Sequence, residues 1–162
     1  MNNYRPLLYK AFFAIAFVIL LGSSLSPAVA GQNPCVFTAS ELGKLVREPL
    51  GEPEIRVPTA RYSVKCAFES VNQPGKKIFI AVRKQETQAE FEALQRLAYL
   101  TNKDKFSQIQ ATGKAAFLTP YAMRAWDGTR ALSIKGVKDV LLREITAAEA
   151  TLLMQTGLAQ LP

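Results

Sequence analysis

The sequence predicts an α+β fold in which about three helices pack on an antiparallel sheet and one disulfide bond joins two parts of the chain. Three observations predict this class. The pattern Thr-x-x-Glu occurs at three places where it fits the N-terminus of a helix. Between these places apolar and polar residues alternate in short runs, which is typical of half-buried strands. Gly, Pro and Asp-Gly separate the runs, and such short turns join antiparallel strands.

The N-terminal segment, residues 1–30, has the pattern of a signal peptide. After a basic start, residues 11–21 are apolar without interruption, a length that suits an export signal but is short for a membrane span. Small side chains follow in the sequence Ala-Val-Ala, which ends at Ala30. We therefore expect cleavage near Ala30/Gly31. The mature chain, residues 31–162, would be a single periplasmic or secreted α+β domain without a transmembrane helix; an uncleaved membrane anchor is the alternative.

The two cysteines, Cys35 and Cys66, are expected to form a disulfide bond. Export places them in an oxidising compartment, where a cysteine pair in a small domain is far more often a bridge than two free thiols. A bridge that closes a loop of about thirty residues contributes roughly 3 to 4 kcal/mol of stability. A catalytic thiol is disfavoured, because the sequence contains no histidine to activate it.

Three capping boxes predict the helices in chain order. They are the pairs Thr38 and Glu41, Thr87 and Glu90, and Thr146 and Glu149. The first helix is short and ends before Pro49, whereas the third extends from about 147 to 161. The expected apolar faces are Leu42, Leu45 and Val46 in the first helix, Phe91, Leu94, Leu97 and Ala98 in the second, and Ala148, Leu152, Leu153 and Ala159 in the third.

Seven segments outside the helices are expected to be strands. They are residues 61–69, 76–84, 106–109, 115–119, 121–126, 130–135 and 140–145. The turn at 72–75 joins the first two segments into a hairpin, and Asp127-Gly128 predicts a second hairpin. The alternation in the first hairpin places Tyr62, Val64, Cys66, Phe68, Ile78, Ile80 and Val82 on the core face.

A resemblance to a known group rests on short motifs spread over most of residues 35–160. They are Cys35-Val36-Phe37-Thr38-x-x-Glu41-Leu42, Gly51-Glu52-Pro53, Cys66-x-Phe68 and Gly113-Lys114-Ala115-Ala116-Phe117, followed by a terminal amphipathic helix. This order resembles small exported bacterial proteins with two cysteines, usually lipoproteins of unknown function with a PsbP-like α+β sandwich. The chain lacks their lipid-accepting cysteine. The resemblance implies the fold and an exported location, and no mechanism.

Several classes of enzyme are excluded by composition and motifs. Without histidine the chain has no Ser/His/Asp triad, no Cys/His dyad and no histidine-ligated metal site. Phosphate-binding glycine loops and calcium-binding loops are absent from the sequence as well, so we expect neither a metal nor a cofactor. The carboxylate pairs Glu52 with Glu54 and Asp127 with Asp139 leave a hydrolase of an envelope polymer as an alternative. We favour ordinary roles for both pairs, in a solvated bend and in a turn.

Positive charge is the sequence feature that suggests a binding partner. The whole chain has a formal net charge of +7, and removal of Arg5 and Lys10 with the signal peptide leaves +5. The predicted hairpin places four cations and one aromatic ring on its outer face, and a second possible contact point lies near the Asp-Gly turn. The candidate binding residues are Arg61, Lys65, Lys77, Phe79 and Arg83 on the hairpin, and Arg124 and Trp126 near the turn.

The function expected from these residues is binding without catalysis. Cations around an aromatic ring attract an anionic ligand or the acidic surface of an envelope protein, and the export signal disfavours nucleic acid as a partner. An inhibitor of another exported enzyme is a further alternative, besides the carboxylate-dependent hydrolase. The structural alternative is that these charges only keep an exposed sheet face soluble, and that Trp126 belongs to the core.

Overall fold

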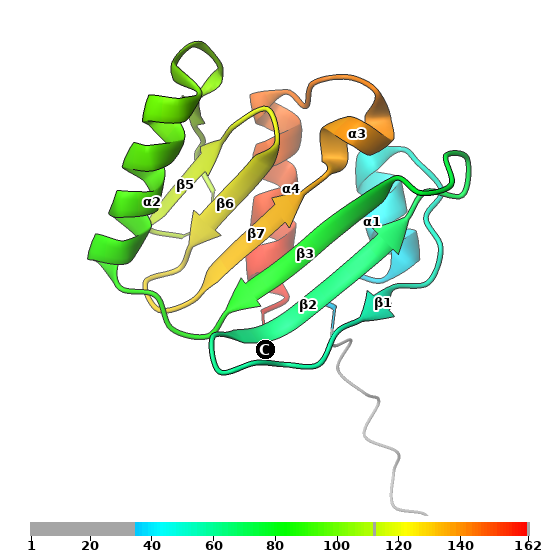
Figure 1. Cartoon of the computed structure of the whole chain (residues 1–162), viewed down its shortest axis with the longest axis horizontal. Helices are drawn as coiled ribbons and strands as arrows, with labels where there is room; N and C mark the ends of the chain where they lie inside the picture. The colour runs from blue at the N-terminus through cyan, green and yellow to red at the C-terminus, as the bar shows by residue number, and fades with distance from the viewer. Residues whose placement is uncertain (1–34, 112, 162) are drawn as a thin grey trace, which may run out of the picture. The chain divides into compact units, whose positions relative to one another are not determined.

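The computed structural model in Figure 1 describes residues 35–111 and 113–161, so the predicted signal peptide and its cleavage site lie outside the described residues. The strands are β1 (Glu54–Ile55), β2 (Tyr62–Glu69), β3 (Lys77–Arg83), β4 (Ser107–Gln108), β5 (Ala115–Leu118), β6 (Ala122–Trp126) and β7 (Ala131–Lys135). The helices are α1 (Ala39–Val46), α2 (Gln88–Thr101), α3 (Val137–Leu141) and α4 (Ala147–Ala159), with a short 3₁₀ helix at Lys103–Lys105.

The strands form one antiparallel sheet in the order β1-β2-β3-β7-β6-β5-β4. The β2–β3 hairpin and the β4–β7 meander meet where β3 pairs with β7, at the centre of the sheet. The predicted Asp-Gly turn joins β6 to β7. The expected α+β fold with an antiparallel sheet and one disulfide is confirmed.

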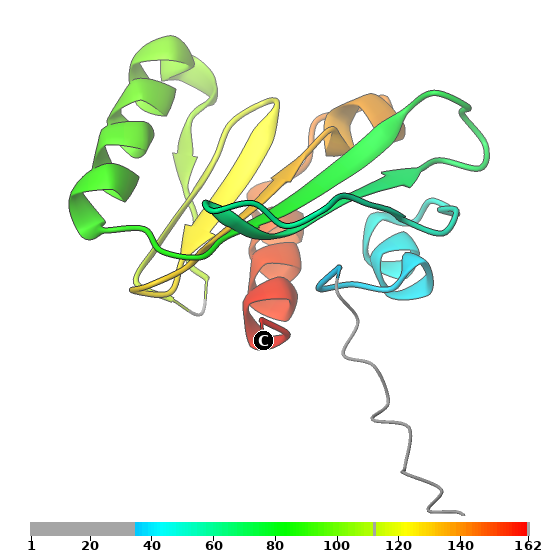
Figure 2. The ribbon, with the colours of Figure 1, turned by 60° about the horizontal axis from the view of Figure 1, so that its bottom comes forward.

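Helices cover both faces of the sheet, but unequally (Figure 2). The main hydrophobic core lies on the face that carries α1, α3 and α4. On the opposite face α2 lies over β5 and β6, where Phe91 packs against Phe117 and Trp126 in a second, aromatic core. In the described part of the chain no helix covers β2 and β3 on that face, which leaves half of it open.

The disulfide between Cys35 and Cys66 is present, with the two Cα atoms 5.6 Å apart. Both cysteines are buried in the main core. The bridge therefore ties the entrance of α1 to the core face of β2, as the sequence predicted.

All three predicted capping boxes are formed. In each, the threonine hydroxyl accepts a hydrogen bond from the backbone N–H three residues later, and the glutamate carboxylate accepts one from the threonine backbone N–H. Two of the four unpaired N–H groups at each helix start are thereby satisfied, which explains why these helices begin at residues 39, 88 and 147.

The prediction of a strand at 140–145 was wrong, because helix α3 ends at Leu141 and residues 142–145 form a turn and a loop. Gly136 precedes this helix with φ of 82°, a left-handed conformation that favours glycine, and a Cβ atom at this position would clash with the carbonyl of Lys77. Val137 and Val140 lie three residues apart and are both buried in the main core. The apolar residues thus follow the helical period, which a short run does not reveal by itself.

The buried faces of α2 and α4 also differ from the prediction. On α2 the side chain of Phe91 is buried, but Leu97 is 60% exposed and points away from the sheet. On α4 the buried residues are Ala150, Leu153, Met154 and Gly157, whereas Leu152 is 52% exposed. The spacing of apolar residues shows which side chains share one face of a helix, but contact with the sheet decides which face is buried.

A bulge in β2 corrects the predicted position of Tyr62. Tyr62 pairs with Arg83 and Val64 pairs with Val82, so Ser63 is an extra residue and the alternation shifts. Paired residues share a face, and Lys65 lies over the Tyr62 ring with its Nζ atom 4.2 Å from the ring centroid. Tyr62 therefore lies on the outer face with Lys65 instead of in the core. Strand β1 is a further difference, since the sequence analysis did not predict it.

Candidate functional site

The uncovered half of the sheet is the candidate site, and its residues follow from the pairing of β2, β3 and β7. Cross-strand partners project from the same face of a sheet, so the register places them in rows. We call this surface the open face and define it by Lys65, Ala67, Lys77, Phe79, Ala81, Ser133 and Lys135. The alternation in the β2–β3 hairpin predicted its first five members.

Phe79 is the apolar centre of the open face. It pairs with Ala67 on one side and with Lys135 on the other, and 42% of it is exposed. Small side chains surround it, because Ala81 and Ser133 form the neighbouring pair. The exposed part of this ring is therefore accessible to an incoming ligand.

Lys77 is neutralised by acidic neighbours. Its ammonium lies 3.3 Å from a carboxylate oxygen of Glu69 and 3.5 Å from one of Glu54 on β1. The hydrogen bond and the charge of Glu69, followed by the charge of Glu54, raise the pKa of Lys77 above its usual value. The sequence placed Lys77 on the correct face, but it did not reveal these acidic partners, of which Glu54 comes from the unpredicted strand.

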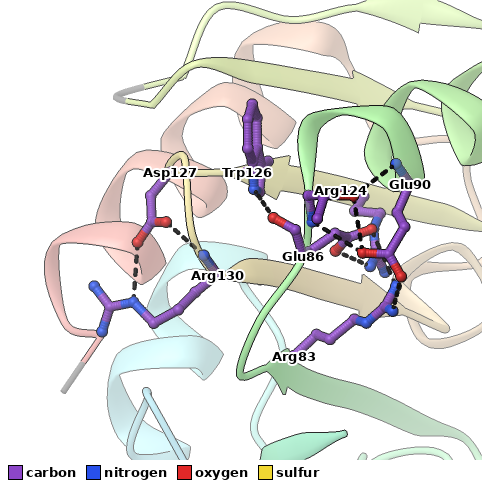
Figure 3. A network of polar contacts seen from close by, with 8 residues as sticks. Arg83, Glu86, Glu90, Arg124, Trp126, Asp127 and Arg130 are labelled. Atoms are coloured by element: carbon purple, nitrogen blue, oxygen red, sulfur yellow. Dashed lines mark hydrogen bonds and ion pairs between the residues drawn. The ribbon is translucent and has the colours of Figure 1, made fainter.

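Arg83 and Arg124 belong to a partly buried ionic network beside α2 (Figure 3). The Arg83 guanidinium lies 2.6 Å from Glu90 and 3.5 Å from Glu86, and Arg124 forms an ion pair with the other carboxylate oxygen of Glu86. The side chain of Glu86 is completely shielded from solvent. These two arginines are therefore held by acids at the edge of the open face.

Trp126 lies in the aromatic core and not on a contact surface. Only 6% of it is exposed, its ring stacks on Phe91 with the centroids 5.9 Å apart, and its indole N–H donates a 2.8 Å hydrogen bond to the backbone carbonyl of Glu86. Sequence reasoning did not identify Glu86, which lies at the centre of this network. Its side-chain partners lie on two different strands, Arg83 on β3 and Arg124 and Trp126 on β6, and β6 is far from Glu86 in the sequence.

Two cations of the open face have no acidic partner among the described residues. Lys65 makes its cation–π contact with Tyr62, and Lys135 makes no ion pair within 4 Å in the described part of the chain. Lys135 pairs directly with Phe79, and Lys65 lies diagonally across from the same ring. Sequence analysis missed Lys135: its strand was predicted, but the adjacency of β7 to β3 was not.

Arg61 lies outside the strands, immediately before β2. It is exposed, and its backbone carbonyl accepts a 3.0 Å hydrogen bond from the N–H of Lys84, which lies across from it at the open end of the hairpin. It thus extends the hairpin by one backbone contact, but it does not belong to the rows around Phe79.

The carboxylates considered for hydrolysis are either paired locally or exposed. Glu54 contacts Lys77 and Arg56, and Asp127 accepts bonds from the N–H groups of Thr129 and Arg130 in its turn. Partial burial alone would raise the pKa of Asp127, but these hydrogen bonds and the Arg130 guanidinium lower it overall. Glu52 and Asp139 are exposed. Among the described residues no group of three or more Asp, Glu, Cys or His side chains is arranged to hold a metal ion.

Two further findings concern the helices and the similarity of the chain to known proteins. None of the helices in the described ranges combines the length and the apolar character that a membrane crossing requires. Comparisons of the chain with models of protein families, with curated proteins and with solved structures found no match.

Proposed function

We propose that this protein is an exported envelope protein that binds an anionic ligand on the open face and does not catalyse a reaction there. The observation that carries the proposal is the arrangement of Lys65 and Lys135 around the exposed ring of Phe79. Both cations lack an acidic partner in the described part of the chain, so a ligand can pair with them without displacing a carboxylate.

The remaining charges of the face favour a ligand with spaced negative groups. The neighbouring cations Lys77 and Arg83 are already paired with glutamates, which confines the unneutralised charge to the two lysines beside Phe79. A ligand that bears carboxylate, sulfate or phosphate groups on an apolar or ring-shaped backbone would contact the lysines and the ring at once. The predicted signal peptide and the disulfide bond support the exported location.

Binding of dextran sulfate, with uncharged dextran as the matched ligand, tests this proposal. We expect the wild-type protein to bind only the sulfated polymer, and the affinity to fall with added salt, since exposed charges are screened over about 8 Å at physiological ionic strength. Replacing Lys65 and Lys135 together by Gln should weaken binding about ten-fold, because each exposed ion pair contributes up to about 1 kcal/mol. The salt dependence should become shallower.

The control variant carries Lys44→Gln and Lys103→Gln. These exposed cations lie on α1 and on the 3₁₀ helix, and the change in net charge is the same. Equal loss of binding in both double variants would show that only net charge matters and would contradict the proposal. Phe79→Ser should lower the affinity without changing its dependence on salt.

A further inference from the structure

Helix α2 carries a second apolar stripe on the side that faces away from the sheet. The stripe consists of Ala89, Ala93, Leu97 and Leu100, all exposed. Leu97 and Leu100 lie in the C-terminal part of α2 and are 60% and 59% exposed, so together with the two alanines they form a contiguous apolar patch. Together with Glu92 and Arg96 the stripe lines a shallow hollow of about 380 Å³.

The angular positions on the helix separate this stripe from the buried side. With a rotation of about 100° per residue, Phe91 and Ala98 face the aromatic core, and Ala93 and Leu100 point in nearly the opposite direction. The sheet therefore cannot bury the stripe by a small adjustment of α2. On the exposed side, Glu92 and Arg96 lie along one flank of the stripe and Leu97 along the other.

We propose that the stripe binds a second copy of this chain, with the two α2 helices packed antiparallel around a two-fold axis near residue 94. The shape of the stripe is self-complementary in this arrangement. Its N-terminal half consists of the small residues Ala89 and Ala93, and its C-terminal half of Leu97 and Leu100. An antiparallel partner places each Leu100 over the small Ala89 of the other copy.

The charges on the flank select the antiparallel orientation. A two-fold axis perpendicular to the helices places the charged flank of one α2 beside the charged flank of the other, and the two helices run in opposite directions. Glu92 of each copy therefore lies beside Arg96 of the other. A parallel pair would bring the charged flank of one helix against the Leu97 flank of its partner. The antiparallel pair thus forms two ion pairs across the interface, and the parallel pair forms none.

The interface is small, which sets the expected behaviour. Helix α2 has 14 residues and is about 21 Å long, and one helix from each copy buries less than the ~800 Å² per partner of a standard interface. We therefore expect a reversible dimer whose population rises with protein concentration, and not a permanent one.

Sedimentation velocity over a range of concentrations tests this inference with protein expressed from the full chain. The wild type is expected to shift from monomer to dimer as its concentration rises. Glu92→Arg and Arg96→Glu should each be monomeric, because each places like charges opposite one another in a homodimer. An equimolar mixture of the two variants should dimerise again, since every cross-chain contact then joins opposite charges.

The recovery in the mixture also shows that both variants are folded. Leu97→Ser should abolish dimerisation, whereas Leu152→Ser, which changes an exposed leucine on α4, should leave it intact. A wild-type protein that stays monomeric at all concentrations would overturn the inference. Dimerisation that survives both charge reversals, or that Leu152→Ser alone removes, would overturn it as well.

Discussion

Glu86, which lies just before α2, connects strands β3 and β6. Its carboxylate holds Arg83 on β3 and Arg124 on β6, and its backbone carbonyl accepts the indole N–H of Trp126. One carboxylate oxygen of Glu86 and the Nε atom of Arg124 are buried without a hydrogen-bond partner in the described structure. Removing one partner of such a buried pair is costly, because the other charge is then left buried without its counter-ion.

Replacement of Glu86 by Leu is expected to lower the free energy of unfolding by about 2 to 4 kcal/mol, because it leaves Arg124 partly buried without its counter-ion. Adding Arg124→Met to that variant should restore a part of the loss. Urea unfolding of the two single variants and the double variant measures the coupling. Losses that simply add would contradict a direct interaction between the two side chains.

Glu149 is the residue with the largest effect of pH expected from the structure. The hydrogen bonds from Arg143 and then from the backbone N–H of Thr146 lower the pKa of Glu149 from 4.5 to about 2. Because the pKa is lower in the folded state, its contribution to stability is complete above pH 4.5 and disappears as the pH falls toward 2.

Glu149→Gln is therefore expected to destabilise the protein by about 1 kcal/mol at neutral pH, a usual loss for a helix cap, and to have less effect near pH 2. Urea unfolding between pH 2 and 7 measures the difference between wild type and variant. Glu52→Gln, an exposed acid in a loop, is the control and should show no such dependence. A constant difference for Glu149→Gln over the whole range would contradict the assignment.

At the scale of elements, the sequence predicts local features better than tertiary ones. The three capping boxes were correct because a cap is decided by residues three apart, independent of the rest of the fold. The predicted face of α2 was correct for Phe91 and Ala98 but wrong for Leu97, because both sides of the helix are apolar and only the sheet decides which one is buried. Helix α3 was read as a strand because Val140 and the two leucines after it are compatible with either period.

The same distinction applies to the candidate site. The alternation in β2 and β3 was sufficient to predict Lys65, Lys77 and Phe79 on one face. It was not sufficient to predict Lys135, because its proximity depends on the pairing of β3 with a strand some fifty residues further along the chain. Of the acids that neutralise Lys77, Glu54 was missed because strand β1 was not predicted, whereas Glu69 is the partner of Lys77 within the predicted hairpin.

The disulfide is the covalent link between two elements, α1 and β2. Cys35→Ser or Cys66→Ser is expected to lower the free energy of unfolding by about 2 to 5 kcal/mol, since the unfolded chain loses a closed loop. Chemical denaturation measures this, and adding a reductant to the wild type should give a similar loss. Two thiols that react with an alkylating agent in the native, non-reduced protein would contradict the bridge.

For the whole molecule, the order of strands has a consequence for folding. The N-terminal hairpin and the C-terminal meander each form from neighbouring segments, but the central contact of β3 with β7 closes over α2 and β4 to β6. Local hairpins form faster than such long-range pairs, because less chain entropy is lost. The open face spans this contact, so it is complete only when both halves of the sheet have joined.

Export is the prediction that concerns the whole chain. Intact-mass measurement of the protein isolated from the host envelope is expected to show a chain that begins at Gly31 and carries no lipid. The reasons are the apolar run at 11–21, the small residues that end at Ala30, and the absence of a cysteine directly after them. A mass that retains Met1, or that includes a lipid, would contradict this prediction.

Trp126 gives the protein a built-in spectroscopic reporter. It is the single tryptophan in the sequence, and it lies between α2 and the sheet with its ring against Phe91. Its fluorescence therefore reports the environment of the aromatic core alone, whereas circular dichroism reports all helices and strands. Detachment of α2 would expose the indole to water and shift its emission to longer wavelength while the rest of the fold persists. Partial opening of this one helix can thus be followed without a label.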